Sequence, residues 1–440
     1  MTWLQYAIVA AVACAVTIML VPPVKRLAIR LDAVDYPSQR RVNKRPVARF
    51  GGVAMFGGLV AAFLTIYIGV RFLGWRYPPF FIAGHKLWYP GIAIGVFVAF
   101  LVGVADDIFN LKPLQKLVGQ IVAASIIAAS GLLLADIHNP FGPGQIYFGW
   151  LAYPITIFYL VAFANVINLI DGLDGLASGI TVIATFTMFV FALITHRPDA
   201  AFLSIALIGV CLGFLRYNFN PASIFMGDSG SLLLGISLGV VSLFATTRSA
   251  LIVSLLMPIL VAGVPIIDTA SAIIRRLRAH RPIQQADRGH IHHRLMQEGY
   301  SQRKTVAIMW GWTAILAVSA IFITELRGMA RIPFIVLAGG VSLFFIVKLH
   351  LLGPVLQHHY NPRPSSGQKR ANERFNAAAG ATGKSEAHAS NEDGADETSA
   401  ASSLASNSEP GPDRRPDAAA RASARRDEGD DGHGDGPARP

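Results

Sequence analysis

Charged residues are scarce in this chain of 440 residues, since Asp, Glu, Lys and Arg together make up 15% of it. Soluble domains usually contain about 25% of these residues, so the scarcity argues against a soluble globular protein. Hydrophobic residues make up 53% of the chain, and the mean hydropathy is +0.47. This composition is typical of a protein that crosses a membrane many times.

Cysteine is almost lacking: the chain has two, Cys14 and Cys211, and both lie within apolar segments. They support neither a disulfide framework nor a metal site. The first apolar segment lacks the basic start of a cleavable signal peptide, and we interpret it as a transmembrane helix. No basic patch with interleaved aromatic residues is present, so we expect membrane lipids and not nucleic acid to meet the basic loops.

Long apolar runs are abundant, and about 20 such residues are needed to cross a bilayer. The sequence therefore predicts an all-α polytopic membrane protein. The split between the eighth and ninth segments rests on a short polar link at residues 247–249. The eleven expected segments are 3–22, 51–70, 90–105, 117–135, 153–170, 174–195, 200–216, 230–247, 250–273, 305–324 and 332–352.

The loops on alternate sides of these segments differ in charge. Loops 23–50, 106–116, 171–173, 216–229 and 274–304 carry 19 Lys and Arg, whereas the opposite loops carry 7. Because basic loops stay in the cytoplasm, we expect a multi-pass protein of the cell membrane with its N-terminus outside and its C-terminus inside.

The chain divides by composition into two regions. Residues 1–355 hold the apolar segments and form an integral membrane domain. Residues 361–440 are rich in Ala, Ser, Gly, Asp and Arg and have almost no large apolar side chains. Such a segment cannot bury enough surface to offset the entropy of ordering, so we expect a disordered cytoplasmic tail.

Acidic residues in the membrane domain are few and clustered. Thirteen precede residue 360, and seven of them lie at or beside the ends of apolar segments, namely Asp106, Asp107, Asp171, Asp174, Asp228, Asp268 and Asp287. A carboxylate near hydrocarbon costs about 2.5–3.5 kcal/mol on insertion scales, so such groups are seldom kept without a role. On the expected topology these acids gather at the cytoplasmic side, which indicates an active-site cleft there for a divalent metal and a phosphorylated substrate.

The first two clusters end the third and fifth segments. Asp106 and Asp107 are adjacent carboxylates, which favours a bound cation or an acid that acts as a base over a solvated helix end. Asn165, Asn168 and Asp171 recur every three residues and share one face of a helix. The glycines on either side of the next acid, at position 174, allow the backbone to break so that this acid also faces the cleft.

The third cluster precedes the eighth segment and contains Asn218, Phe225, Asp228, Ser229 and Ser231. Capping of the helix explains one of the polar groups at its start. Helix N-termini also attract phosphate, and oxygen ligands suit Mg²⁺. Phe225 is a candidate for stacking on a nucleotide base, with ordinary packing as the alternative.

The fourth cluster is the run His290-Ile291-His292-His293-Arg294 in the long loop after the ninth segment. No cysteine or further histidine pair completes a zinc site there. Beside acidic loops suited to Mg²⁺, these side chains are better read as donors to a diphosphate. A basic stretch that includes Lys44 and ends at Gly51-Gly52 is a further candidate for closing over phosphates, although the rule that basic loops stay inside explains it equally well.

Together these clusters resemble the polyprenyl-phosphate N-acetylhexosamine-1-phosphate transferase family, glycosyltransferase family 4. The resemblance runs in order from about residue 42 to residue 295. One branch of the family transfers phospho-N-acetylmuramoyl-pentapeptide and has three adjacent histidines. The other transfers N-acetylglucosamine-1-phosphate and has a His-x-His-His-Arg pattern, which this chain resembles at residues 290–294.

The resemblance implies an active site for the transfer of N-acetylglucosamine-1-phosphate from UDP-N-acetylglucosamine to undecaprenyl or another polyprenyl phosphate in the inner leaflet. It implies Mg²⁺ as the cofactor, with Mn²⁺ as an alternative. The implied metal ligands are Asp228 and Asp171, and the implied catalytic residues are Asp106, Asp107 and His290. The implied substrate-binding residues are Asn165, Asn168, Asp171, Asp174, Asn218, Phe225, His292, His293, Arg294 and Lys44.

Three alternatives remain at this stage, and one of them, a degenerate and non-catalytic scaffold, would not need every acidic position intact. Phospho-N-acetylmuramoyl-pentapeptide transfer shares the chemistry and differs in the histidine pattern. A membrane transporter is the alternative of another class, but transporters place their charges near the middle of the bilayer and between repeated halves. The sequence leaves the oligomeric state open, with a homodimer among the alternatives.

Overall fold

A computed structural model describes residues 2–36, 46–75, 81–82, 85–138, 144–246, 259–278, 289–326 and 328–351. Its helices are α1 (Trp3–Arg30), α2 (Gly51–Phe72), α3 (Tyr89–Phe109), α4 (Pro113–Ala129), α5 (Ala152–Ile170), α6 (Leu176–Ile194), α7 (Pro198–Asn218), α8 (Gly227–Thr246), α10 (Gly263–Arg278), α11 (Ile291–Gln297), α12 (Gln302–Glu325) and α13 (Ile332–Lys348). Its short strands are β1 (Val34–Asp35), β2 (Val47–Arg49), β3 (Phe81–Ile82), β4 (His85–Lys86), β5 (Asp136–His138), β6 (Gln145–Tyr147) and β7 (Ile224–Phe225), and single 3-10 turns are η1 (Gly149–Leu151) and η2 (Gly328–Arg331).

The prediction of an all-α polytopic membrane protein is confirmed. Among the described residues, nine helices are long and apolar enough to cross a membrane. The predicted segment 117–135 is α4, which begins earlier, at Pro113, and is shorter than a typical span at 17 residues. The predicted segment 250–273 begins outside the described residues, and its second half belongs to the amphipathic helix α10. The expected tail, 361–440, also lies outside the described residues, so the domain boundary stays a prediction.

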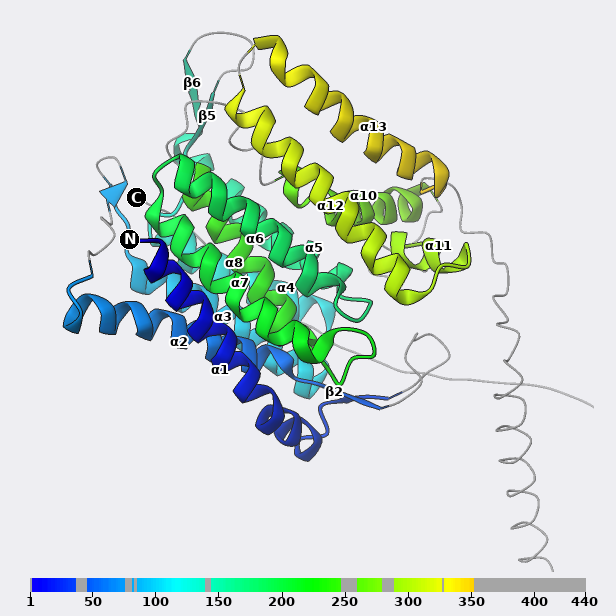
Figure 1. The fold of residues 1–440 in the computed structure, drawn as a ribbon, viewed down its shortest axis with the longest axis horizontal. Helices are drawn as coiled ribbons and strands as arrows, with labels where there is room; N and C mark the ends of the chain where they lie inside the picture. The colour runs from blue at the N-terminus through cyan, green and yellow to red at the C-terminus, as the bar shows by residue number, and fades with distance from the viewer. Residues whose placement is uncertain are drawn as a thin grey trace, which may run out of the picture. The chain divides into compact units, whose positions relative to one another are not determined.

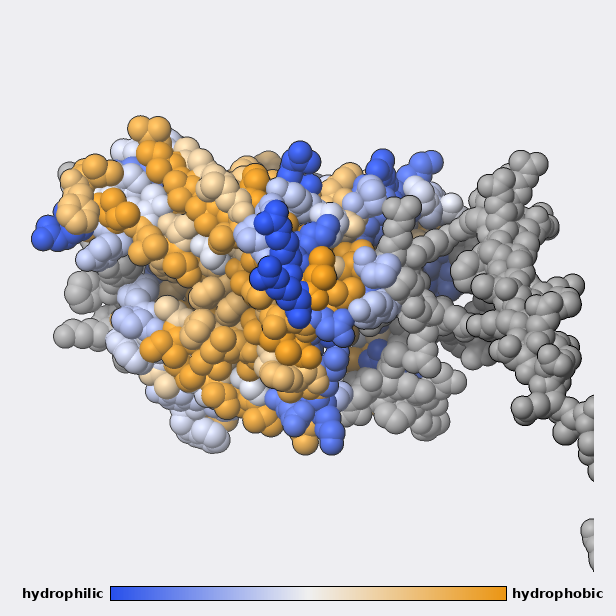
Figure 2. Space-filling view, turned by 90° about the horizontal axis from the view of Figure 1, so that it is seen from below, coloured by the Kyte–Doolittle hydropathy of each residue, from blue (hydrophilic) through white to orange (hydrophobic). Residues whose placement is uncertain are grey.

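The outer surface of the helices is apolar. Figure 2 shows a broad hydrophobic surface on the face in view. On α2, for example, Phe63, Leu64 and Tyr67 are 45%, 54% and 62% exposed. Soluble monomers rarely expose continuous apolar patches of more than a few hundred Å², so this surface fits a lipid environment.

Helix α8 forms the centre of the bundle. Nearly all of its residues are buried, and it packs against α2, α3, α5, α6 and α7 (Figure 1). Helix α12 packs against α6, and α13 lies outside α12 with few buried residues. The helix that carries Asp228 at its start is therefore fixed on several sides.

A small three-stranded sheet joins distant parts of the chain at one end of the bundle. Strand β2 pairs antiparallel with β1 and parallel with β7, where Ala48 lies beside Ile224. The Gly52 N–H also donates to the Met226 carbonyl at 2.8 Å. These contacts hold the start of α2 against the start of α8. Figure 1 shows β5 and β6 at the opposite end of the helices from β2.

Candidate active site

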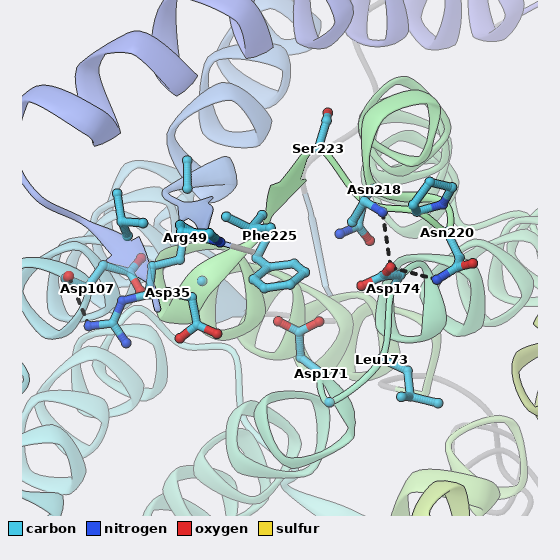
Figure 3. Close-up of a pocket in the computed structure, with 18 of the residues that line it drawn as sticks. Asp35, Arg49, Asp107, Asp171, Leu173, Asp174, Asn218, Asn220, Ser223 and Phe225 are labelled. Carbon is cyan, nitrogen blue, oxygen red and sulfur yellow. Dashed lines mark hydrogen bonds between the residues drawn. The ribbon is translucent and has the colours of Figure 1, made fainter. Parts of the chain in front are cut away.

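A cavity of about 930 Å³ opens at the end of the bundle where the small sheet lies. Its walls come from the last turns of α1, α5 and α7, the first turns of α8 and α12, the sheet strands and α11. Asp107, Asp171 and Asp228 all line it, although they are far apart in the sequence. Figure 3 shows Asp107 and Asp171 there. The expectation that these acids meet in one cleft at one end of the bundle therefore agrees with the structure.

One charged cluster stands at the wall of this cavity. The Lys116 ammonium lies 3.3 Å from Asp106 Oδ2 and 3.2 Å from Asn168 Oδ1, and it also contacts Asp228 Oδ2. The Asn168 amide donates to Asp228 Oδ1 at 2.8 Å and to the Ser231 hydroxyl at 2.7 Å. Two carboxylates and an amide oxygen thus converge on one cation.

Asp107 faces the start of α8. Its two carboxylate oxygens accept the backbone N–H groups of Asp228 and Ser229, at 2.8 and 3.0 Å. Negative charge at a helix N-terminus is favourable, because the first N–H groups have no partners within the helix. Gly227 has φ +69°, and a Cβ there would lie 2.5 Å from the Asp107 carboxylate. Asp107 therefore caps α8 from another helix and fixes the backbone of Asp228.

Two glycines let neighbouring helices approach this capped end. A Cβ at Gly52 would lie 2.1 Å from the backbone nitrogen of Gly230, and a Cβ at Gly103 would lie 2.3 Å from the Asp228 carbonyl oxygen. Neither gap accommodates a side chain. The close contacts of α2 and α3 with the first turn of α8 thus depend on glycine at both positions.

Asp171 ends α5 and projects into the cavity below Phe225 (Figure 3). Its carboxylate makes no hydrogen bond or ion pair with the part of the chain that the structure describes. Its shielding from solvent, and then the nearby charges of Asp228, Asp107 and Asp174, raise the pKa of Asp171 to about 8. A cation or a hydrogen-bond donor from a ligand would relieve this cost.

Asp174 and Asn218 tie two loops together. Asp174 Oδ2 accepts from the Asn220 amide at 2.9 Å and from the backbone of Ala222 at 3.0 Å. Asn218 Oδ1 accepts from the backbone of Gly175 at 3.0 Å, and its amide donates to a backbone carbonyl next to Phe225. Both side chains line the cavity, but most of their hydrogen-bonding capacity already serves the loops.

The backbone break between α5 and α6 forms as expected, but the two glycines act differently. Gly175 has φ +77°, a conformation that glycine adopts without strain. Gly172 has no positive φ; instead a Cβ there would lie 2.9 Å from the His292 ring. Gly172 therefore makes room for His292 beside Asp171.

The histidine run is anchored by an acid on α10. Asp268 Oδ2 lies 3.0 Å from His290 Nδ1, and Asp268 Oδ1 accepts the backbone N–H of Ile291 at 2.8 Å. The hydrogen bond and the charge of His290 hold the pKa of Asp268 below its usual value, against the effect of burial. Asp268 thus fixes the ring of His290 and the start of α11.

His292 and His293 line the cavity, and the rings lie 4.3 Å apart. His292 is buried, and its Nδ1 has no hydrogen-bond partner among the described residues. Burial, and then the charge of His293, lower the pKa of His292 to about 3, with Asp268 acting in the opposite direction. A buried imidazole nitrogen without a partner, next to a cavity, is suited to a ligand.

Arg294 does not line the cavity. Its guanidinium donates to the carbonyl oxygens of Leu349 at 2.9 Å and His350 at 2.8 Å, at the end of α13, and to that of Gly289 at 3.1 Å. The nearby Arg275 donates to Leu351 at 2.7 Å. These bonds satisfy the free carbonyls of a helix C-terminus and join α13 to the histidine run.

The predicted residues thus fall into three groups. Of the described residues, Asn168, Asp171, Asp174, Asn218, Phe225, His292, His293, Asp107 and Asp228 line the cavity, whereas Asp106, Asn165, His290 and Arg294 do not. Asn165 donates to Gln120 on α4 at 2.5 Å and so joins two helices. Lys44 lies outside the described residues. The roles assigned to all of these residues stay predictions.

Sequence reasoning missed Lys116, which it left in the loop before the fourth segment. The signal was present, because Pro113 favours the first position of a helix and so predicts that Lys116 lies in the first turn of α4. It also gave no role to Asp35, which lines the cavity from the sheet beside Arg49, a member of the basic stretch that ends at Gly51-Gly52 (Figure 3). Arg49 donates to the Asp107 carbonyl oxygen at 3.2 Å and contacts the Asn110 side chain.

The oxygen set suits a hard divalent cation. Asp228, Asp106 and the Asn168 side-chain oxygen offer carboxylate and amide ligands, which Mg²⁺ accepts together with water. Within the described ranges, no group of three or more His, Cys, Asp or Glu side chains is placed to hold a metal by itself. A metal there would therefore depend on the amide, on water or on substrate for its remaining ligands.

A bundle of apolar helices with an acidic cavity at one end, a capped helix start and a buried histidine run defines a membrane-embedded enzyme for phosphorylated substrates. The sequence profile of glycosyl transferase family 4 matches residues 89–246. The chain belongs to this family, the polyprenyl-phosphate N-acetylhexosamine-1-phosphate transferases, which are phosphotransferases.

Three relatives illustrate the two branches. The chain is 40% identical to a probable undecaprenyl-phosphate N-acetylglucosaminyl 1-phosphate transferase of Bacillus subtilis, over 71% of this chain and 84% of the relative. It is 36% identical to a decaprenyl-phosphate N-acetylglucosaminephosphotransferase of Mycobacterium tuberculosis, over 72% and 82%. A phospho-N-acetylmuramoyl-pentapeptide-transferase of Desulforudis audaxviator is 32% identical, over 71% and 96%.

Proposed function

We propose that this protein transfers N-acetylglucosamine-1-phosphate from UDP-N-acetylglucosamine to undecaprenyl or another polyprenyl phosphate and releases UMP. The product would be polyprenyl-diphospho-N-acetylglucosamine, the first lipid-linked intermediate of a cell-wall, teichoic acid or O-antigen-type polymer. The observation that carries the proposal is the convergence of Asp107, Asp171 and Asp228 on one cavity at the end of apolar helices. The names of the more similar relatives support the choice of sugar.

The location of the cavity fits two substrates of opposite solubility. One arrives from water and the other lies in lipid, so the reaction needs a site at their boundary. The basic loops favour the cytoplasmic side of the cell membrane for this end of the bundle. The inner leaflet would then supply the polyprenyl phosphate.

The reaction joins a phosphate oxygen of the lipid to the β-phosphorus of the sugar nucleotide and breaks the bond from that phosphorus to the oxygen of UMP. Alignment and neutralisation of charge matter more than covalent chemistry in such a transfer. Mg²⁺, or Mn²⁺ in its place, would supply charge neutralisation and hold phosphate oxygens. Asp228, Asp106 and Asn168 offer it ligands.

The chain's own residues bind and orient the substrates. Phe225 presents a ring to the cavity on which uracil can stack, and Asp171 below it accepts hydrogen bonds from the uridine side. His292, which lies beside Asp171, and His293 donate to the diphosphate and sugar from the wall that α11 forms. Asp268 keeps this wall in place through His290. The lipid phosphate is already largely ionised at neutral pH, so it needs little help from a base; Asp106 would position it through the metal, and Asp107 through the start of α8 that it caps.

The test uses the purified full chain in detergent with polyprenyl phosphate and Mg²⁺. Each of several UDP-sugars is added in turn, and the lipid product is identified by mass spectrometry together with UMP. We expect a lipid diphosphate with one N-acetylhexosamine from UDP-N-acetylglucosamine only. A product from UDP-N-acetylmuramoyl-pentapeptide would assign the chain to the other branch, and no product from any donor would refute the transferase activity.

Asp228→Asn is the matched variant for this assay. It keeps the shape of the side chain and removes its charge, so it should abolish Mg²⁺-dependent UMP release while the protein still inserts into membranes. Insertion is checked by extraction with detergent and by an unchanged thermal unfolding transition. Retained activity would remove Asp228 from the metal site.

A further inference from the structure

Lys116 occupies an unusual place for a lysine in a membrane bundle. Its side chain is 16% exposed, and its ammonium contacts the carboxylates of Asp106 and Asp228 and the side-chain oxygen of Asn168. These three residues are the ones whose oxygens are best suited to a divalent cation. The lysine therefore uses the same oxygens as the metal of the proposed reaction.

The place of Lys116 is built into the fold. Pro113 begins α4, and the Lys112 backbone N–H donates to the Gln115 side chain at 2.9 Å, which fixes the first turn. Lys116 follows in that turn and donates its backbone N–H to the Lys112 carbonyl at 3.2 Å. The ammonium is thus delivered to the carboxylates from a fixed helix start.

Its oxygen partners are equally fixed. Asp107 holds the backbone of Asp228, and the amide of Asn168 holds one of the Asp228 side-chain oxygens while it also binds Ser231. Asp228 therefore cannot move away from Asp106 without breaking these bonds. Mg²⁺ binds oxygen at about 2.0–2.1 Å, so a metal held between these three oxygens would occupy the space that the ammonium fills.

We infer that Lys116 and the divalent cation compete for the oxygens of Asp106, Asp228 and Asn168, so that the metal enters by displacing the ammonium. This inference rests on the proposed metal-dependent transfer. The exchange lets the acids stay neutralised in both states, since one cation replaces another. It also makes the affinity for free metal weaker than the oxygen set alone would give.

The competition predicts the direction in which the affinity for the metal changes when Lys116 is replaced. Removing the positive charge at position 116 should tighten metal binding in the absence of substrate, because the metal then meets two carboxylates without a built-in counter-ion. Ordinarily the loss of an active-site lysine would leave metal binding unchanged or weaken it through damage to the fold. A coupling of two charges at this range predicts an effect of about tenfold or more.

The experiment measures Mn²⁺ binding to the purified full chain in detergent, without substrate, by electron paramagnetic resonance of free Mn²⁺. The variants are Lys116→Met and, as the charge-retaining variant, Lys116→Arg. Lys112→Met is the matched control, because it removes a lysine from the start of the same helix whose ammonium makes no ion pair with these acids in the part of the chain that the structure describes. Thermal unfolding with and without Mn²⁺ accompanies each titration.

We expect Lys116→Met to bind Mn²⁺ about tenfold more tightly than the wild type, and Mn²⁺ to raise its unfolding temperature more. Lys112→Met should resemble the wild type, and Lys116→Arg should not gain affinity. Adding Asp228→Asn to Lys116→Met should remove the gain. Equal or weaker binding by a folded Lys116→Met, or a gain in Lys112→Met as large, would overturn the competition.

These results are separate from the proposed activity. The sugar nucleotide assay can fail for every donor while the Lys116→Met variant still binds Mn²⁺ more tightly, which would refute the transfer and leave the exchange standing. Product formation with no gain in Mn²⁺ affinity would do the reverse.

Discussion

Asp107→Asn tests whether the second acid of the adjacent pair is a capping group. The structure gives both of its carboxylate oxygens to the backbone N–H groups of Asp228 and Ser229. Asparagine keeps one acceptor, but its amide nitrogen turns a donor toward the other N–H group. The neighbouring Asp106→Asn is the matched control, since Asp106 contacts the Lys116 side chain and caps no helix that the structure describes.

The two variants should lower the free energy of unfolding by different amounts. Losing one charge-assisted hydrogen bond at a buried position costs about 1.5–3 kcal/mol, and losing the charge at a helix N-terminus adds about 0.3–1 kcal/mol. Asp107→Asn should therefore lower the free energy of unfolding by about 2–4 kcal/mol. Asp106 pairs with Lys116, which keeps Asp228 as a second acidic partner, so Asp106→Asn should cost less stability than Asp107→Asn.

The assay is unfolding of the purified protein by titration with sodium dodecyl sulfate in mixed micelles, followed by circular dichroism. Equal losses of stability in the two variants would refute the capping role. A stable Asp107→Asn protein that has lost all activity would instead favour direct participation in catalysis.

Three further perturbations follow from the geometry. Gly103→Ala should lower stability by about 1–3 kcal/mol through overpacking, while Gly340→Ala on α13, where a Cβ meets nothing within 4 Å, should be neutral in the same unfolding titration. Arg294→Gln should destabilise the protein by about 1.5–3 kcal/mol through the lost bonds to α13, with a KM for UDP-N-acetylglucosamine near the wild-type value; a raised KM at unchanged stability would place Arg294 on the substrate. The folded state keeps His292 neutral, because its pKa is lowered to about 3. Below about pH 6.5 only the unfolded imidazole gains a proton, so the free energy of unfolding should fall by about 2 kcal/mol at pH 5. His292→Gln should flatten this pH profile, and an unchanged profile would contradict the reasoning.

The sequence was enough to predict which helix ends hold the acids that line the cavity. The apolar segments predict where the chain crosses the bilayer, and each crossing reverses its direction. Asp107, Asp171 and Asp228 follow or precede segments on the same side, so their meeting in one cavity could be expected without coordinates. The break at Gly175 could also be expected, because a continued helix would turn Asp174 to the face opposite Asn165.

The partner of each acid could not be predicted, because partners come from contacts between distant segments. Asp107 and Asp228 are 121 residues apart, and nothing in either motif indicates that the first caps the helix of the second. The adjacent pair at 106 and 107 reads as one chemical unit, but the helix turns the two side chains to different neighbours. Arg294 looked like a phosphate ligand beside the histidines, and its contacts with the end of α13 depend on a helix that follows much later.

The pairing of β2 with β7 has a consequence for biosynthesis. Ala48 finds its neighbour Ile224 only after the six described helices that separate them, α2 to α7, have left the ribosome. Until then the nascent chain carries a strand edge without a partner and a cleft without its far wall. A translation product that stops before α8 thus presents unsatisfied backbone groups at the membrane surface, a signature by which quality-control proteases can recognise an incomplete chain.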